Sequence, residues 1–276
     1  MEEEIDLSGV IDLHVHSAPD DRPRLLDDFG VAHAAGGAGM RAILLKNHST
    51  LTADRAALVA PHVPGLAVLG GLVLNAQVGG INPAAVEFAL ALGAREVWLP
   101  TLSAANHRHY EGRKGGIKIL NEQGEASEAV LEVLALLAEK DVILGTGHIA
   151  FSEIAAVIPA ARRAGMKRIL VTHPEFPPVN LSIQQQLALA GPGIWFERCY
   201  ASTTSIGGGV PMARITADIR ALGVETTILS TDLGQAVNPA PVQGFRLYLA
   251  ALAEAGFTSA ELDRMARHNP TEVSGL

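Results

Sequence analysis

The sequence has only one cysteine, few aromatic residues and no apolar run long enough to cross a membrane. Cys199 is the single cysteine of the 276 residues, so no disulfide can form within the chain, which fits a reducing compartment. Glycines interrupt the longest apolar run, at residues 64–74, and it falls short of the ~20 residues of a membrane span. The first residues, Met-Glu-Glu-Glu, lack the basic start of a secretory signal. We therefore expect a cytoplasmic protein without membrane contact.

The chain also has little positive charge. Its formal net charge is −8, and no stripe of basic residues with interleaved aromatics is present, so nucleic acid is not an expected partner. Hydrophobic residues make up 48% of the chain and charged residues 18%, which excludes disorder and supplies a large core. These values predict a globular protein. A homo-oligomer is compatible with this composition.

A weak internal repeat organises the sequence. Residues 35–46 resemble residues 161–173, and residues 91–101 and 221–232 are looser copies. Each copy has an alanine-rich helix end, a glycine at the helix C-cap position and a short apolar strand that ends in a polar residue. The predicted strands are residues 9–14, 41–46, 66–74, 95–100, 141–146, 168–172, 193–197 and 226–231.

Helical stretches separate most of these strands. They are residues 27–36, 52–60, 83–92, 126–139, 152–164, 182–190 and 211–222, followed by a last helix at 242–255 or 259–267. Nearly continuous apolar strands are typical of a parallel sheet that helices cover. Eight strand–helix units in about 250 residues favour a closed barrel over an open sheet. The predicted fold is therefore a single α/β domain over residues 1–276, a (β/α)8 TIM-type barrel, regular or distorted.

One long insertion, at about residues 103–125, interrupts the repeat. Residues 117–124 within it have the pattern of a small hairpin, and we expect the insertion to lie over a barrel mouth as a loop or lid. His107 and His109 on the insertion, and Arg22 after the first strand, are candidates to bind an anionic substrate. A solvated surface loop explains these residues equally well.

The most informative motif is residues 11–16, Ile-Asp-Leu-His-Val-His, in which an apolar strand carries two histidines. Side chains two residues apart on a strand project from one face, so His14 and His16 can reach the same metal ion. Asp12 lies on the same face of the expected strand and could hold an imidazole by its other nitrogen. The alternative is a surface strand that happens to carry two histidines.

Further polar residues follow the other strands, at the end where barrels of this type place their chemistry. They are Lys46 and His48 after the second strand, His148 after the fifth, His173 after the sixth, Glu197 at the end of the seventh and Asp232 after the eighth. Five of the ten histidines thus fall at strand ends. Four imidazoles and a carboxylate suit Zn²⁺ or a similar ion.

Several of these residues have structural alternatives. A tight glycine turn explains the residues before His148, and helix capping explains Asp232. Lys46 could form an ion pair with Glu197 or Asp232, since a lysine binds metal only when carboxylated or deprotonated. His48 could cap a turn or act as a ligand. Glu197 could form a buried ion pair or face the substrate.

The pattern resembles the amidohydrolase superfamily of metal-dependent hydrolases. Members of that superfamily carry His-x-His on the first strand, one histidine each on the fifth and sixth strands, and an aspartate on the eighth. The matching residues here are His14, His16, His148, His173 and Asp232. The last residues, His268–Leu276, also resemble the Asn-Pro-Ala…Gly-Leu ending common in the superfamily.

The resemblance implies a role for each matching residue. His14 and His16 would bind the more buried metal. His148 and His173 would bind a second ion, or His173 would help to position the attacked bond. Asp232 would bind metal and act as the catalytic base toward a water whose pKa the metal lowers to about 7.

One feature departs from the superfamily pattern. Binuclear members usually carry a bridging carboxylated lysine or a glutamate on the fourth strand, and here Trp98–Thr101 ends that strand without one. Lys46 on the second strand is a substitute bridge. Residues Lys46–Thr50 also resemble a segment of the polymerase-and-histidinol-phosphatase phosphoesterases, but Asp232-Leu-Gly lacks the second histidine of that family. One and two zinc ions per chain are therefore equally compatible with the sequence.

The resemblance implies a metal-dependent hydrolase that cleaves an amide, ester or lactone-type bond of a small molecule. A non-oxidative decarboxylase of the same superfamily and a metal-dependent phosphoesterase are the alternatives. A metal-binding barrel without activity is a further class, because fold does not settle function.

Overall fold

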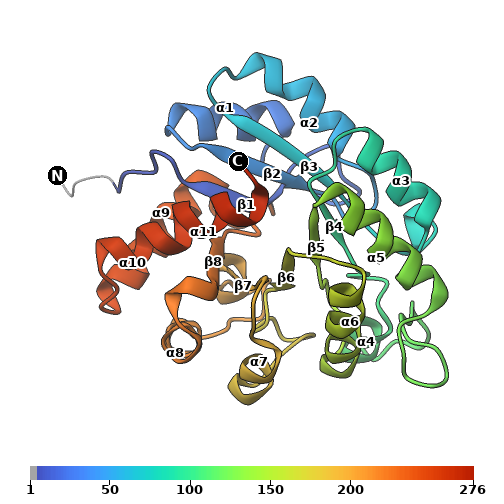
Figure 1. Cartoon of the computed structure of the whole chain (residues 1–276). Helices are drawn as coiled ribbons and strands as arrows, with labels where there is room; N and C mark the ends of the chain where they lie inside the picture. The colour runs from blue at the N-terminus through green and yellow to red at the C-terminus, as the bar shows by residue number, and fades with distance from the viewer. Residues whose placement is uncertain (1–4) are drawn as a thin grey trace.

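Eight parallel strands lie side by side in the order β1 to β8, and helices surround them (Figure 1). The computed structural model describes residues 5–276, so the acidic start, Met1–Glu4, lies outside the described residues. The strands are β1 (Ile11–His16), β2 (Ala42–Lys46), β3 (Ala67–Val73), β4 (Glu96–Trp98), β5 (Ile143–Gly145), β6 (Ile169–Thr172), β7 (Ile194–Cys199) and β8 (Thr227–Ser230). All eight predicted strands are present, and the predicted (β/α)8 barrel is confirmed.

The helices between the strands also lie where the sequence predicts them. They are α1 (Asp28–Gly37), α2 (Ala53–Val59), α3 (Pro83–Ala91), α5 (Glu128–Lys140), α6 (Phe151–Arg163), α7 (Ile183–Leu189), α8 (Met212–Leu222) and α9 (Pro241–Glu254). Local capping fixes several starts. Asp27 accepts a hydrogen bond from Gly30 N at the start of α1, and Ser182 and Gln185 form a capping box at α7.

Both ranges proposed for the last helix are helical. After α9 the chain forms α10 (Ser259–Asp263), a π-helical turn (Arg264–His268) and α11 (Asn269–Ser274), which the sequence did not predict as a separate helix. Asn269 ties this end to the barrel because its Nδ2 donates to Val224 O and Thr227 O, at 2.7 and 2.6 Å. The ending that resembles the superfamily thus has a structural role here.

The strands are buried on both faces. Inside the barrel, Ile11, Leu44, Trp98 and Leu170 belong to one apolar cluster, which Val273 of α11 joins at the amino end. Larger apolar clusters fill the space between the strands and the surrounding helices. This double burial is why the strands read as continuous apolar runs. The packed interior leaves the carboxyl ends of the strands as the place for a site.

The insertion after β4 forms a wall beside the barrel mouth. It contains the helix α4 (Ala105–Tyr110), which the sequence did not predict, and its hairpin is reduced to one antiparallel bridge between Leu120 and Ala126. Asn106 fixes α4, since its Nδ2 donates to His148 O at 3.0 Å and to Pro178 O at 2.7 Å.

The barrel closes at its carboxyl rim. Asp232 N donates to His14 O at 2.8 Å, and His16 N donates to Leu233 O at 2.8 Å, so the segment after β8 pairs with β1. The next residue, Gly234, has φ +136°, and a Cβ on it would lie 1.8 Å from His16 O. Only glycine fits this position.

Among the described helices, none is both long and apolar enough to cross a bilayer.

The closure predicts a large cost for a side chain at Gly234. We expect Gly234→Ala to lower the free energy of unfolding by at least about 2 kcal/mol, because the Cβ would meet the His16 carbonyl in a backbone conformation unfavourable to alanine. Urea unfolding followed by circular dichroism measures the change. Gly37→Ala is the matched control, since a Cβ there meets nothing within 4 Å, and its stability should be unchanged or slightly higher. Equal stability of both variants would contradict this account of the rim.

Candidate functional site

A cavity of about 560 Å³ lies at the carboxyl ends of the strands. The predicted site residues that line it are Arg22, Lys46, His48, His107, His148, His173 and Asp232. They come from β2, from the segments after β1, β2, β5, β6 and β8, and from the insertion. Residues far apart in the chain therefore converge on one space at the barrel mouth.

His14 and His16 meet Asp232 at this end of the barrel. Asp232 Oδ1 lies 3.1 Å from His14 Nε2 and 3.0 Å from His16 Nε2. Burial lowers the pKa of His16 to about 3, so this ring is neutral near pH 7. Burial alone would raise the pKa of the Asp232 carboxyl, but the two histidines outweigh it and hold that pKa well below its usual range. A charged carboxylate thus faces a neutral imidazole with a lone pair available for an ion.

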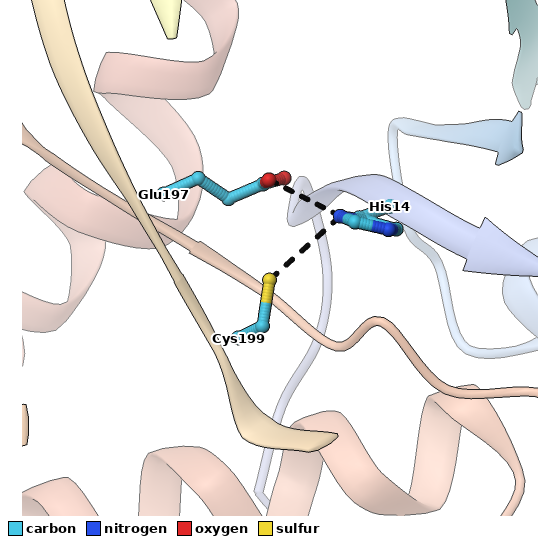
Figure 2. Close-up of side chains that lie close together, drawn as sticks. All are labelled: His14, Glu197 and Cys199. Atoms are coloured by element: carbon cyan, nitrogen blue, oxygen red, sulfur yellow. Dashed lines mark hydrogen bonds and ion pairs between the residues drawn. The ribbon is translucent and has the colours of Figure 1, made fainter. Parts of the chain in front are cut away.

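Glu197 and Cys199 of β7 lie on the opposite side of the His14 ring (Figure 2). Glu197 Oε2 is 3.1 Å from His14 Nδ1, and Cys199 Sγ is 3.7 Å from the same nitrogen. Glu197 is fully buried and is not among the residues that line the cavity, so its placement favours the buried ion pair over contact with substrate. A carboxylate in this position orients the ring and makes the other nitrogen a better ligand.

Asp12 does not hold an imidazole. The pairing of β1 with β2 shifts register between Asp12 and Val15, which breaks the alternation that placed Asp12 on the histidine face. Its carboxylate instead accepts from Thr231 N at 3.0 Å, from Thr231 Oγ1 at 2.6 Å and from His14 N at 3.2 Å. Burial raises the pKa of Asp12 to about 7. Glu197 therefore occupies the role that the sequence suggested for Asp12.

Lys46 reaches into the same cluster from β2. Its Nζ lies 3.0 Å from His14 Nε2 and 4.9 Å from the centroid of the Trp98 ring. Burial lowers the pKa of this amine, while the charges of Asp232 and Glu197 oppose the shift. Lys46 thus lies at the nitrogen that would bind metal. Within residues 5–276 it contacts His14 and Trp98, and the direct ion pair with Glu197 or Asp232 that the sequence allowed is not formed.

Glu96 on β4 is a site residue that sequence reasoning missed. It is fully buried, and neither carboxylate oxygen has a hydrogen-bond partner within residues 5–276. Gly145 makes room for it, because a Cβ there would lie 2.6 Å from Glu96 Oε1. Burial raises the pKa of Glu96 well above its usual value, with Glu197 adding to the shift and Lys46 opposing it. The signal in the sequence is a glutamate inside an apolar strand, whereas the predicted site consists of residues at and after strand ends.

His148 and His173 form the other side of the cluster. Their ring centroids are 4.9 Å apart, and the His173 ring is 5.8 Å from that of His14. Burial lowers the pKa of both rings well below the usual range. In the described chain, buried His173 Nδ1 has no hydrogen-bond partner. His173 and Asp232 also have positive φ angles of 28° and 52°, a strain that proteins commonly keep at functional positions.

The remaining candidates differ in their placement. His48 Nδ1 lies 2.9 Å from Thr101 Oγ1, and its ring is 4.9 Å from that of His16. His107 lines the cavity, and its Nδ1 is 2.7 Å from His148 Nδ1, so it also holds a neighbouring ring. His109 is exposed and is not among the residues that line the cavity, which favours the solvated surface position that the sequence also allowed. His107 and His109 are two residues apart on a helix, so their side chains project from nearly opposite faces.

The cluster satisfies the geometric requirements of a metal site. The ligand atoms of His14, His16 and Asp232 lie within 4.8 Å of one another, as do those of His14, Glu197 and Cys199. Ligands of a tetrahedral zinc ion with bonds of about 2.0–2.2 Å lie roughly 3.3–3.5 Å apart, close to the observed separations. The unpartnered His173 Nδ1 adds a further donor. The donor set therefore fits a borderline divalent ion.

The barrel matches solved structures of several enzymes. A metallopeptidase, dipeptidase AC, is 15% identical, with a TM-score of 0.62 and coverage of 97% of this chain and 98% of its own. An amidohydrolase from Pseudomonas aeruginosa is 12% identical, with a TM-score of 0.64 and coverage of 97% and 95%. A 2,6-dihydroxybenzoate decarboxylase from Rhizobium is 12% identical, with a TM-score of 0.57 and coverage of 97% and 99%. The predicted resemblance to the amidohydrolase superfamily is confirmed at the level of the fold.

Sequence comparison adds a family. The profile of a family of unknown function (DUF6282) matches residues 9–197, a range that contains His14, His16, His148 and His173 but not Asp232. A search of curated proteins finds no match to the chain.

In metal-free protein, His16 should make stability depend on pH. Its folded pKa of about 3 lies below the value of 6.5 expected for an unfolded histidine, so only the unfolded chain gains a proton between these values. The free energy of unfolding therefore falls as the pH falls from about 7.5 to about 5.5. Over this range the decrease should be roughly 1 kcal/mol smaller for His16→Asn than for the wild type. Urea unfolding with a chelator present measures both. The control His33→Asn, at an exposed position of α1, should keep the wild-type slope, and equal slopes for all three proteins would contradict the prediction.

Proposed function

The chain belongs to the protein family DUF6282, and from this starting point we propose that it is a metal-dependent hydrolase of small molecules. The observation that carries the proposal is the convergence of His14, His16 and Asp232: Asp232 Oδ1 lies 3.1 Å from His14 Nε2 and 3.0 Å from His16 Nε2. Asp232 also lines a cavity large enough for a small molecule. The arrangement combines an ion site with access for a substrate.

The donor set favours zinc. His14, His16 and Asp232 would hold the first ion, and His173, with His148 beside it, would contribute to a second ion or bind the substrate. When bound, such an ion supplies Lewis acidity, which lowers the pKa of water toward 7 and polarises a carbonyl group. Glu96 is a buried carboxylate on the fourth strand, where binuclear members carry the group that bridges the two metal ions. Glu96 and Lys46 are therefore both candidates for that bridge.

The protein's own groups supply the acid–base chemistry. The Asp232 carboxylate is ionised near pH 7 and lines the cavity, so it is placed to take a proton at its oxygen and return it to a leaving group. Glu197 keeps the His14 ring in one orientation from behind. Phe176, whose ring centroid is 4.8 Å from that of His173, and Pro177 cover the histidines and limit the access of bulk water.

The solved relatives support the choice of reaction class without deciding it. The barrel is shared with a metallopeptidase and an amidohydrolase, and also with a decarboxylase. A non-oxidative decarboxylase and a phosphoesterase are thus outcomes that the same assays distinguish. Turnover of a nitrophenyl ester or a lactone supports hydrolysis at carbon. Release of CO₂ from small aromatic acids, or turnover of nitrophenyl phosphate alone, would replace the proposal by one of the alternatives.

The role of Asp232 can be tested directly. We expect the zinc-loaded protein to turn over an ester or lactone, and Asp232→Asn to lower kcat by at least about a hundredfold because the amide cannot accept the proton. Circular dichroism should show an unchanged fold. Asp54→Asn, an exposed position on α2, is the matched control and should keep full activity. Wild-type turnover by Asp232→Asn would remove the proposed base.

Metal binding gives a second, independent test. The protein should bind one or two zinc ions per chain, measured by atomic emission after dialysis. Glu197→Gln should weaken zinc binding roughly tenfold, because the charge behind His14 is lost. The control Glu87→Gln changes an exposed carboxylate of α3 and should bind zinc as the wild type does. Unchanged affinity in Glu197→Gln would show that this carboxylate does not support a ligand.

A further inference from the structure

The rim of the cavity carries a cation without a partner. Arg22 lines the cavity, and its guanidinium makes no hydrogen bond or ion pair with any residue that the structure describes. The other basic side chains nearby are engaged. Arg24 binds Asp20 at 2.8 Å, Lys46 lies against His14, and Arg113 forms an ion pair with Glu111.

The charge of Arg22 acts toward the histidines. Burial is the main cause of the lowered pKa values of His48 and His107, and the positive charge of Arg22 contributes to both. It also lowers the pKa of its neighbour Asp21, whose side chain accepts from Ser49 Oγ at 3.1 Å. The guanidinium is thus close enough to the inner cavity to act on a ligand bound beside these rings.

Part of the cavity lining is apolar and exposed. Tyr110, Ile206 and Val237 line the cavity with exposed fractions of 58%, 57% and 75%. They come from three separate segments, on α4, after Tyr200–Thr203 and after β8. Large apolar side chains gathered at one opening gain stability only when something apolar covers them. The cavity lining therefore offers exposed apolar side chains and, as far as residues 5–276 are concerned, a guanidinium of Arg22 without a partner.

We propose that the substrate is a carboxylic acid with an apolar body, whose carboxylate binds Arg22 while its body rests on Tyr110, Ile206 and Val237. The planar guanidinium matches a carboxylate in a two-pronged contact, whereas a phosphate dianion usually takes several cations. A cavity of about 560 Å³ is of the size that binds small organic molecules. The proposal names the substrate class of the metal-dependent hydrolase proposed above and rests on that function for its biological meaning, but the binding itself does not require the metal.

The test compares 4-phenylbutyrate with its neutral amide, 4-phenylbutyramide, by calorimetric titration of chelator-treated protein at constant ionic strength. The two probes share one apolar body and differ only in charge. The wild type should bind the acid roughly tenfold more tightly than the amide, as expected for one charge-assisted contact. Arg22→Gln should remove this preference and leave the affinity for the amide unchanged. Arg22→Lys, which keeps the charge without the fork, should retain part of the preference.

Control variants keep the outcome decisive. Arg113→Gln removes an exposed arginine already paired with Glu111 and should bind both probes as the wild type does. Tyr110→Ala should weaken both probes equally, because it removes apolar contact only. Equal preference in wild type and Arg22→Gln would overturn the proposal, as would a loss in Arg22→Gln that is the same for acid and amide. Tighter binding of 3-phenylpropyl phosphate than of the acid would overturn the choice of carboxylate.

The two proposals fail in different ways. A protein that prefers the acid through Arg22, but binds no zinc and shows no turnover, would retain the binding site and lose the hydrolase. An active zinc enzyme whose Arg22→Gln variant keeps the wild-type preference would retain the hydrolase and lose this substrate class.

Discussion

The candidate site depends on the way the last strand segment closes the barrel against the first. Asp232 N donates to His14 O, and His16 N donates to Leu233 O, both at 2.8 Å. The backbones of all three proposed ligand residues thus take part in the two hydrogen bonds that join these segments. The distance between the carboxylate and the imidazoles is therefore set by main-chain pairing and not by flexible side chains. A slip of one residue along this seam would turn the histidines to the other face of β1. Gly234, which no side chain could replace without meeting His16 O, holds the seam in register.

The same convergence places an unusual amount of charge in the interior. Glu197 and Lys46 are buried against His14, Glu96 is buried close enough for their charges to act on its pKa, and the ionised Asp232 adds a negative charge. Burying charges is costly unless they are neutralised and hydrogen-bonded, and both oxygens of Glu96 lack a partner in the described chain. One lysine opposes three carboxyl groups, so a bound divalent cation would reduce the electrostatic cost. A cluster of this kind lowers stability in the absence of a function, which supports the view that the charges serve binding.

Much of this could be predicted from the sequence, for identifiable reasons. The strands are apolar on both faces, which makes them visible as short runs, and parallel strands of a barrel bring their carboxyl ends together, so His148, His173 and Asp232 could be placed beside His14 and His16. Local pattern is a poor guide where tertiary geometry overrides it. An irregularity in β1 turns the Asp12 carboxylate away from the histidines and toward the backbone of Thr231. His107 and His109 lie on different faces of a short helix. Glu96 lies inside a strand, and its place in the site is visible only from the residues packed around it.

The division between barrel and loops explains why the fold alone leaves the substrate open. The strands supply the histidines and carboxylates, and an amidohydrolase, a metallopeptidase and a decarboxylase share this barrel at 12–15% identity. The rim is built from loop segments, and loops are the parts of a barrel that change most freely without loss of the core. Arg22, Ile206 and Val237 lie on such segments, and Tyr110 lies at the end of the short helix α4 within the insertion. The proposed selectivity therefore resides in contacts that the common fold does not dictate. A cavity lined by Arg22 and by exposed apolar side chains suits a substrate with both a negative charge and an apolar body, which a neutral or wholly polar substrate lacks.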